Sequence, residues 1–220
     1  MEKIKPYASI EEAMQELDNG GRFYNLFTKV QDEVITPAEL SKVSGVFLTK
    51  QRMILFLEMA LSRLDEKAKE EVLSKLDDRL QLHYQNYKPL QITVSEAIKE
   101  HCSSSIIVTG TPKPNTSKSA LKGFVMIPVG KSFTLVPIVD LYDIYELTDE
   151  HTAEKLLIAH SKRSTKLPEQ KLMMGGIWKK FPTTSDQRTA ADQALTTDAL
   201  EPSTSNQRGK RYLEIHYFLE

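Results

Sequence analysis

The chain has 220 residues, with 29 Lys and Arg against 30 Asp and Glu, and a formal net charge of −1. This balance gives no overall attraction to nucleic acid or to an anionic membrane. The single cysteine, Cys102, cannot form an internal disulfide, which favours a reducing compartment such as the cytoplasm. The first residues lack the apolar run of a secretory signal, and no segment is long and apolar enough to cross a bilayer.

Residues 1–102 are predicted to form a helical domain, a bundle of about five helices with apolar side chains at helical spacing. Three capping boxes mark helix starts: Ser9 with Glu12, Thr36 with Glu39, and Thr93 with Glu96. Thr49 is expected to cap a further, strongly apolar helix. Asp65 is expected to cap a longer, more charged helix that runs to about Tyr84.

Residues 103–220 are predicted to form a β-rich domain, so the whole chain is expected to be α+β. The expected sheet is mainly antiparallel, or a small open β-barrel. Short strands are predicted at 105–109, 156–159 and 171–180. Residues 110–119 (GTPKPNTSKS) indicate a polar, turn-rich loop.

The most apolar part of the chain predicts a β-hairpin. Residues 121–129 and 132–139 flank Gly130-Lys131, which fits a two-residue turn with Gly first. The resulting register sets Val129 opposite Ser132, Ile127 opposite Thr134, Val125 opposite Val136, Pro128 opposite Phe133 and Phe124 opposite Pro137. Both prolines then occupy non-hydrogen-bonded positions, so we expect a hairpin whose outer sides are only partly paired.

Asp140, Asp143 and Glu146 follow the hairpin at a spacing of three. A short helix here would bring the three carboxylates onto one face, where they could hold a divalent cation. A solvated acidic face or a continued strand would also explain the pattern, and we assign no metal. Gly175-Gly176, in the 171–180 strand, would allow a bulge or the close approach of another backbone.

Residues 182–209 contain almost no large apolar side chain and are predicted to be a mobile loop. The last segment, Arg211–Leu219 (RYLEIHYFL), has strong β character. A strand on so long a tether can return to its own sheet or add to the sheet edge of a partner. We favour its return to its own sheet.

Charge is polarised within the β-rich half. Residues 138–150 hold five acidic and no basic residues, whereas 155–181 hold seven basic residues against one Glu, a change from −5 to +6. Such polarity steers encounter with a charged partner. We therefore predict a non-catalytic adaptor or assembly protein that binds a protein partner through this region. The expected partner-binding residues are Lys162, Arg163, Lys166, Trp178, Lys179 and Lys180.

Two alternatives remain open from the sequence. In the first, the basic 155–181 region binds nucleic acid, with Trp178 stacking on bases. In the second, the chain is an enzyme whose site forms in space around Asp140, Asp143 and His160, with His216 as a further candidate. No catalytic motif, metal-binding spacing or cofactor fingerprint is present, so neither a cofactor nor a metal is predicted.

Overall fold

The computed structural model describes residues 2–19, 31–43, 49–99, 104–129, 132–148, 154–161, 166–180 and 211–220, without the side chains of residues 116–141 and 180. These residues form six helices and one open, mixed sheet of eight strands, so the α+β class is confirmed. The helices are α1 (Ile10–Leu17), α2 (Pro37–Val43), α3 (Lys50–Ala60), α4 (Glu66–Ser74), α5 (Asp78–Tyr87) and α6 (Val94–Lys99). The strands are β1 (Glu2–Lys3), β2 (Leu90–Gln91), β3 (Ser105–Gly110), β4 (Pro112–Val129), β5 (Ser132–Thr148), β6 (Lys155–Ser161), β7 (Leu172–Lys180) and β8 (Arg211–Leu219). The loop predicted at 182–209 lies outside the described residues.

Local capping sets where the helices begin. At α2, the Thr36 N–H donates to Glu39 Oε2 at 2.8 Å, and the Glu39 N–H donates to Thr36 Oγ1 at 3.3 Å. The Thr93 box before α6 makes the same pair of bonds. Ser9 Oγ likewise accepts from the backbone of α1. Each box supplies partners for backbone N–H groups that a helix start leaves free.

The predicted long helix from Asp65 to about Tyr84 is wrong, because the structure divides it into α4 and α5. The Ile35 N–H donates to Lys75 O at 2.7 Å, and the Asp77 N–H donates to Ile35 O at 2.9 Å. Asp77 then caps α5 through its side chain. A short segment far away in the sequence therefore hydrogen-bonds to the backbone between the two helices. This tertiary contact overrides local helix propensity.

The sheet order is β2-β3-β7-β8-β6-β5-β4, with β1 also paired to β8. Four neighbouring pairs are antiparallel: β3–β7, β7–β8, β5–β6 and β4–β5. Three are parallel: β2–β3, β6–β8 and β1–β8. The sheet is thus open and of mixed direction: its antiparallel pairs outnumber the parallel ones, as the predicted mainly antiparallel sheet requires, and the parallel pairs come from β2, β1 and the contact of β6 with β8.

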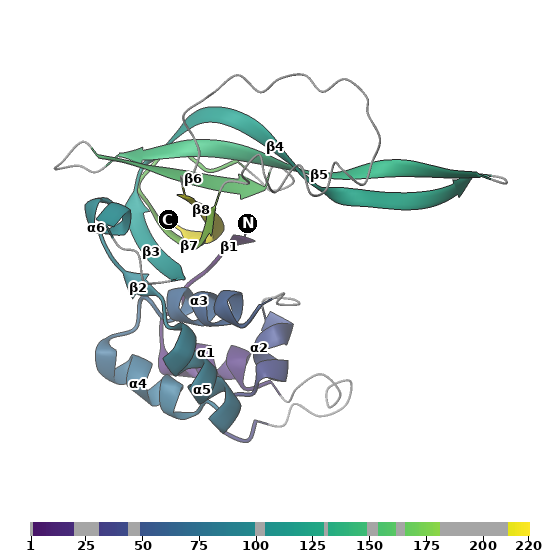
Figure 1. Cartoon of the computed structure of the whole chain (residues 1–220). Helices are drawn as coiled ribbons and strands as arrows, with labels where there is room; N and C mark the ends of the chain where they lie inside the picture. The colour runs from purple at the N-terminus through teal and green to yellow at the C-terminus, as the bar shows by residue number, and fades with distance from the viewer. Residues whose placement is uncertain are drawn as a thin grey trace.

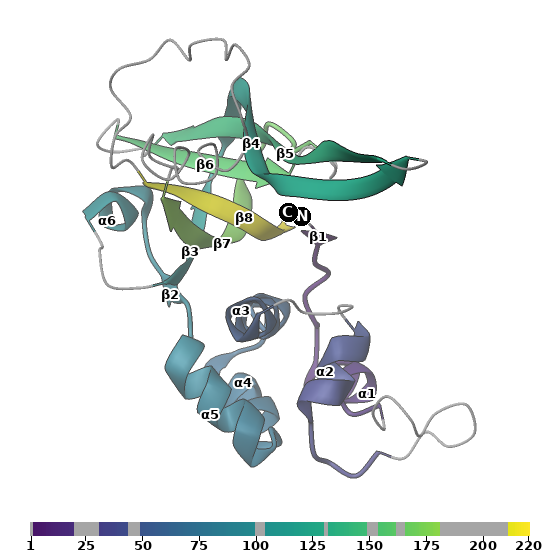
Figure 2. The same ribbon diagram turned by 45° about the vertical axis from the view of Figure 1, so that its right-hand side comes forward.

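The last strand returns to its own sheet, as predicted, and it lies inside the sheet between β7 and β6. The N-terminal strand β1 runs beside it, with Glu2 opposite Tyr217. Figures 1 and 2 accordingly show the two chain ends next to each other. The sequence allows a bulge or a close backbone approach at Gly175-Gly176, and the register of β7 with β8 shifts there, with His216 of β8 as the extra residue.

Two clusters of buried side chains cover the two faces of the sheet. The helix-side core joins the helices, chiefly α3, to sheet residues that include Ile107, Ile177 and Tyr217. The α6-side core contains Val94 and Ala97 of α6 with inner residues of β3, β5, β6, β7 and β8. The bundle arrangement of the helices and a domain division near residue 102 remain predictions.

The predicted hairpin register is confirmed in every pair stated above. The strands are longer than predicted, however, and the polar loop predicted at 110–119 is wrong. Residues 112–119 belong to β4, where Pro112 pairs with Leu147 and Ser119 with Leu141. The sequence of this stretch is turn-like, but β5 supplies a strand partner along its whole length, which decides its conformation.

Candidate functional site: the β4–β5 arm

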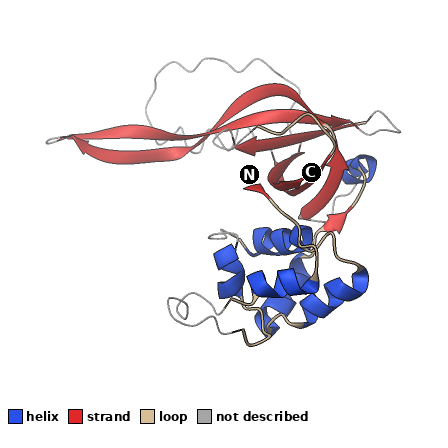
Figure 3. Ribbon diagram, turned by 180° about the vertical axis from the view of Figure 1, so that it is seen from behind, coloured by secondary structure: helices blue, strands red, loops and turns tan. Residues whose placement is uncertain are grey.

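The most distinctive feature of the molecule is the end of the β4–β5 hairpin, residues 123–129 and 132–138, which we call the arm. Its seven register pairs run from Gly123–Ile138 to Val129–Ser132. Among the described strands, β5 pairs with β6 only from Tyr142 to Thr148, and β4 is the last strand in the order. The arm therefore projects beyond the sheet as a two-stranded ribbon (Figures 1 and 3).

Strand alternation divides the arm into two faces, because residues that pair across a hairpin share a face. We call them the aromatic face and the branched face. The aromatic face comprises Phe124, Met126, Pro128, Phe133, Leu135 and Pro137. The branched face comprises Gly123, Val125, Ile127, Val129, Ser132, Thr134, Val136 and Ile138. Neither face carries a charged residue, so the ribbon is apolar on both sides.

The edges of the arm are poorly suited to pairing with another strand. Counted from the Val129–Ser132 pair beside the turn, Pro128 and Pro137 occupy non-hydrogen-bonded positions, whose backbone nitrogens face away from the hairpin partner. Proline has no N–H to donate there. Pro112 and Pro114 are two further positions of β4 without a backbone N–H. Such prolines block edge-to-edge addition of strands, which leaves the two faces as the contact surfaces.

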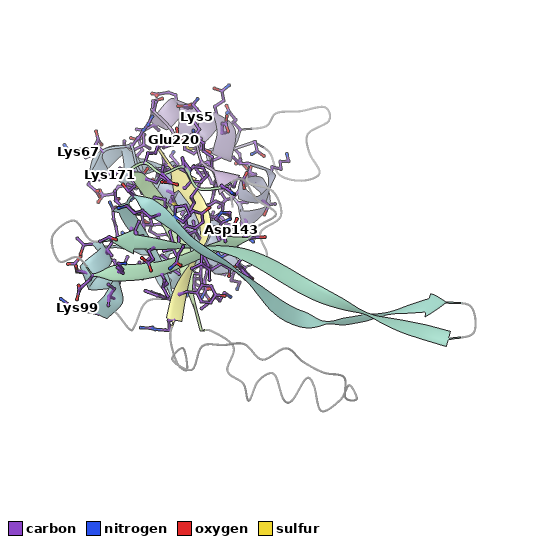
Figure 4. The ribbon with its side chains drawn as sticks, turned by 90° about the horizontal axis from the view of Figure 1, so that it is seen from above. Lys5, Lys67, Lys99, Asp143, Lys171 and Glu220 are labelled. Atoms are coloured by element: carbon purple, nitrogen blue, oxygen red, sulfur yellow. The ribbon has the colours of Figure 1, made fainter. Side chains whose placement is uncertain are left out.

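The acidic residues at the base of the arm lie on a strand and not on the helix that the metal hypothesis requires. The chain continues as strand β5 here, so Asp143 faces the opposite side from Asp140 and Glu146. Glu146 instead accepts bonds from Lys155 and Asn115, each at 2.8 Å. Among the described residues, no group of three His, Cys, Asp or Glu side chains is placed to hold a metal ion. Figure 4 labels Asp143 near the place where the arm leaves the sheet.

The hypothesised enzyme site brings only two of its members together. Asp143 and His160 are register partners on β5 and β6, and both are buried. His160 Nδ1 lies 2.8 Å from Ser161 O, so this nitrogen carries the proton. The other nitrogen, Nε2, then accepts from the Tyr145 hydroxyl at 3.4 Å. Burial lowers the pKa of His160, which keeps the ring neutral as a buried structural group.

His216 lies on the other face of the sheet from His160. It follows Glu214 on β8, and its Nε2 is 3.9 Å from Glu214 Oε2. The pKa of His216 is lowered to about 3, chiefly by burial and in part by the nearby positive charges of Arg52 and Lys179. The neutral ring therefore makes no ion pair with Glu214 at neutral pH. The four proposed enzyme residues are not assembled into one site.

The basic residues predicted to bind a partner are only partly described, since Lys162, Arg163 and the side chain of Lys180 lie outside the described set. Lys166 is exposed. Trp178 and Lys179 follow each other on β7 and therefore face opposite sides of the sheet. Trp178 packs against the α6-side core, and the Arg211 guanidinium carbon lies 5.0 Å from its ring centre. Trp178 is therefore half-buried against this core, and a role for it in binding a partner stays a prediction.

Comparisons with protein-family models and with curated proteins found no match for this chain. The candidate site therefore depends on geometry alone. The sequence predicted the hairpin and its register correctly, and the binding role of the basic segment stays a prediction. The signal that identifies the arm was already present: two apolar strands without a charged residue, in which both alternating faces are apolar.

Proposed function

We propose that this chain is a non-catalytic interaction and assembly protein that binds a protein partner through the arm. The supporting observation is a seven-pair ribbon, apolar on both faces, that has no neighbour among the described strands. A two-stranded hairpin is at best marginally stable alone in water, and extended apolar surface usually marks an interaction site. A partner that covers the arm would both stabilise the hairpin and remove its apolar surface from water.

Insertion into a lipid bilayer is a poorer fit for the arm. Lys131 lies between the two arm strands in the sequence, so a charged residue would have to enter the hydrocarbon together with the arm. The free backbone groups on the outer edges of the ribbon would also lose their hydrogen bonds there, which costs several kcal/mol for each group. A protein surface can supply partners to such groups. None of the described helices is long and apolar enough to span a membrane.

The basic residues are proposed to assist binding from the rim. Lys166 and Lys179 are exposed, and charged groups at a rim mainly change the rate of association. Changing Lys166 and Lys179 to Glu should slow binding and weaken its salt dependence while leaving the arm contact intact. We place this function in the cytoplasm on the argument of the single cysteine.

Site-specific photo-crosslinking in native cells tests the proposal. A photoreactive residue replaces Leu135 on the aromatic face or, as a control, Asn86, which is exposed on α5. We expect discrete protein adducts from position 135, resistant to nuclease, and none from position 86. Adducts to lipid or nucleic acid at position 135, or the absence of any adduct there, would refute the proposed function.

A further inference from the structure

A pocket of about 390 Å³ lies between α4 and α5. Its lining comes from both helices and from Leu76 in the turn that joins them. Figures 1 and 2 both show these two helices side by side, in the helical part of the molecule and away from the arm. The volume is comparable to that of sites that take small molecules in proteins.

The inner walls of the pocket are apolar. Leu76 is buried in the helix-side core, and Leu73 packs against the same core. The half-buried ring of Tyr84 adds an aromatic surface to the lining. An aliphatic group set against these three side chains would lose contact with water, which favours its binding.

The polar side chains of the lining have already used donors within the protein. The Ser74 hydroxyl and Gln81 Nε2 donate to backbone oxygens at 2.7 Å and 2.9 Å. The Tyr84 hydroxyl donates to Glu58 Oε2 at 2.6 Å. The side-chain oxygens of Ser74, Gln81 and Tyr84 can still accept. The pocket therefore offers mainly acceptors, and a ligand group that donates hydrogen bonds fits it best.

The charge of the pocket has the sign that such a donor needs. Among the described lining residues, Glu70 alone is charged, and it is exposed at the rim. Glu58, behind Tyr84, forms a buried ion pair with Lys69, so these two charges largely cancel. Glu70 is left as the uncompensated charge of the lining, and it attracts a cation.

The surroundings of Tyr84 agree with this sign. The pKa of Tyr84 is raised, chiefly by burial and in part by its hydrogen bond to Glu58 and by the negative charges of Glu58 and Glu66. The hydroxyl thus stays protonated and keeps its bond to Glu58. Lys88 Nζ lies over the Tyr84 ring, 5.5 Å from its centre, which is a cation–π contact with an ammonium group of the chain itself.

We propose that this pocket binds a small molecule that carries a primary ammonium group on an aliphatic chain. The ammonium has three donors and no acceptor, which matches Glu70 and the acceptor oxygens of the lining. The aliphatic chain lies against Leu73, Leu76 and the Tyr84 ring. An anion of the same length would meet the charge of Glu70 without a cation to balance it. This site is separate from the arm and goes beyond the function proposed above.

Titration of the full chain with n-pentylamine, followed by two-dimensional nuclear magnetic resonance, tests the proposal. The amine is charged at neutral pH, as a lysine side chain is. We expect the backbone amide resonances of Ser74, Gln81 and Gln85 to shift. Pentan-1-ol has the same aliphatic chain without the charge and should bind at least about fivefold more weakly. Pentanoate, which is an anion, should produce no shift at these positions.

Three variants place the ammonium in the pocket. Glu70→Gln should weaken the binding of n-pentylamine about fivefold, because an exposed charge contributes modestly to an ion pair. Gln85→Glu adds a second carboxylate to the lining and should strengthen the binding by a similar factor. Glu71→Gln is the matched control, because Glu71 is also exposed on α4 but does not line the pocket. Its affinity for the amine should equal that of the unmodified chain.

Four outcomes would overturn the proposal. These are the absence of any shift with n-pentylamine, shifts confined to residues outside the pocket, equal affinity for n-pentylamine and pentan-1-ol, and equal losses in Glu70→Gln and Glu71→Gln. The third would show that only apolar contact operates, and the fourth that the amine is attracted by acidic surface in general. Melting temperatures equal to that of the unmodified chain would show that the variants are folded.

Discussion

At the scale of single residues, the hydroxyl of Tyr145 satisfies two buried groups at once. It accepts from the Leu167 N–H at 3.3 Å and donates to His160 Nε2 at 3.4 Å. Its ring also stacks on the His160 ring, with centroids 5.5 Å apart. This arrangement ties β5, β6 and the segment before β7 together through one side chain. It also explains how a fully buried histidine is tolerated, since both ring nitrogens have partners.

Replacing Tyr145 by Phe should destabilise the protein by about 1–3 kcal/mol, because it leaves the Leu167 N–H and His160 Nε2 buried without partners. Chemical denaturation measures the loss. Tyr87→Phe is the control for loss of a tyrosine hydroxyl, because Tyr87 is partly buried and its ring contact with His83 does not need the hydroxyl. Equal stability of the two variants would show that the Tyr145 hydroxyl carries no such role.

His216 should make the stability of the protein depend on pH. Its pKa is about 3 in the folded chain against an ordinary value of 6.5, so between these values the unfolded chain binds a proton that the folded chain does not. The contribution of His216 to the free energy of unfolding is therefore fully present above pH 6.5, and it is lost as the pH decreases toward 3. At pH 5 the loss from this residue is about 2 kcal/mol.

Denaturation of His216→Gln at pH 7 and pH 5 measures this contribution, because Gln has no charge to gain. The variant should lose about 2 kcal/mol less than the unmodified chain over this interval. The charged groups near the ring include Arg52, Lys179 and Glu214, and all three are unchanged in the variant. Part of the pH dependence should persist in the variant, because burial also lowers the pKa of His160. Identical slopes for both proteins would refute the assignment.

At the scale of elements, two adjacent glycines allow the sheet to be packed on both faces. A Cβ at Gly175 would collide with Met59 Sδ and lie 3.0 Å from Leu55 Cδ1, so its absence lets α3 approach β7. A Cβ at Gly176 would lie 2.7 Å from Leu213 Cγ and 2.8 Å from the backbone oxygen of Glu214. The two sites therefore differ in what would have to move: a flexible side chain at the first, and backbone at the second.

Alanine at either glycine should destabilise the protein by about 1–3 kcal/mol, and Gly176→Ala should cost more than Gly175→Ala, because a backbone oxygen cannot rotate away. Thermal and chemical denaturation give the comparison. When Met59 is already replaced by Ala, the further change Gly175→Ala should destabilise the protein less than Gly175→Ala does in the unmodified chain. Thr109→Ala, at an exposed position of β3, is the control for a harmless change. The opposite ranking of the two glycines would contradict this account of the bulge.

An element can be predicted from the sequence when the residues that determine it are close together in the chain. Capping boxes and the hairpin register are decided by neighbouring residues, and both were predicted. The separation of α4 from α5 depends on Ile35, about forty residues away, and the strand at 112–119 depends on β5. No local pattern contains these partners. For the candidate site, the apolar arm and its faces could be predicted from the sequence, and the strand predicted at 171–180 already implied that Trp178 and Lys179 face opposite sides.

At the scale of the whole molecule, the sheet cannot be completed until the end of the chain is in place. The strand β8 lies between β7 and β6 and also pairs with β1, so the two ends of the chain meet at its centre. It contributes Leu213 and Ile215 to the α6-side core and Tyr217 to the helix-side core. Pairings of such long sequence separation make a fold slow to form but bind its parts into one cooperative unit.

Removal of residues 211–220 should therefore abolish cooperative unfolding, because β6 and β7 lose their common neighbour and both cores lose buried side chains. Shortening the arm, by replacing residues 124–137 with Asn-Gly, should leave the thermal transition nearly unchanged, because the arm has no partner in the rest of the described sheet. Near-ultraviolet circular dichroism of Trp178 and differential scanning calorimetry measure both variants. A truncated chain that still unfolds cooperatively would show that β8 is an optional strand, and would make it, rather than the arm, the first segment to test for binding to a partner.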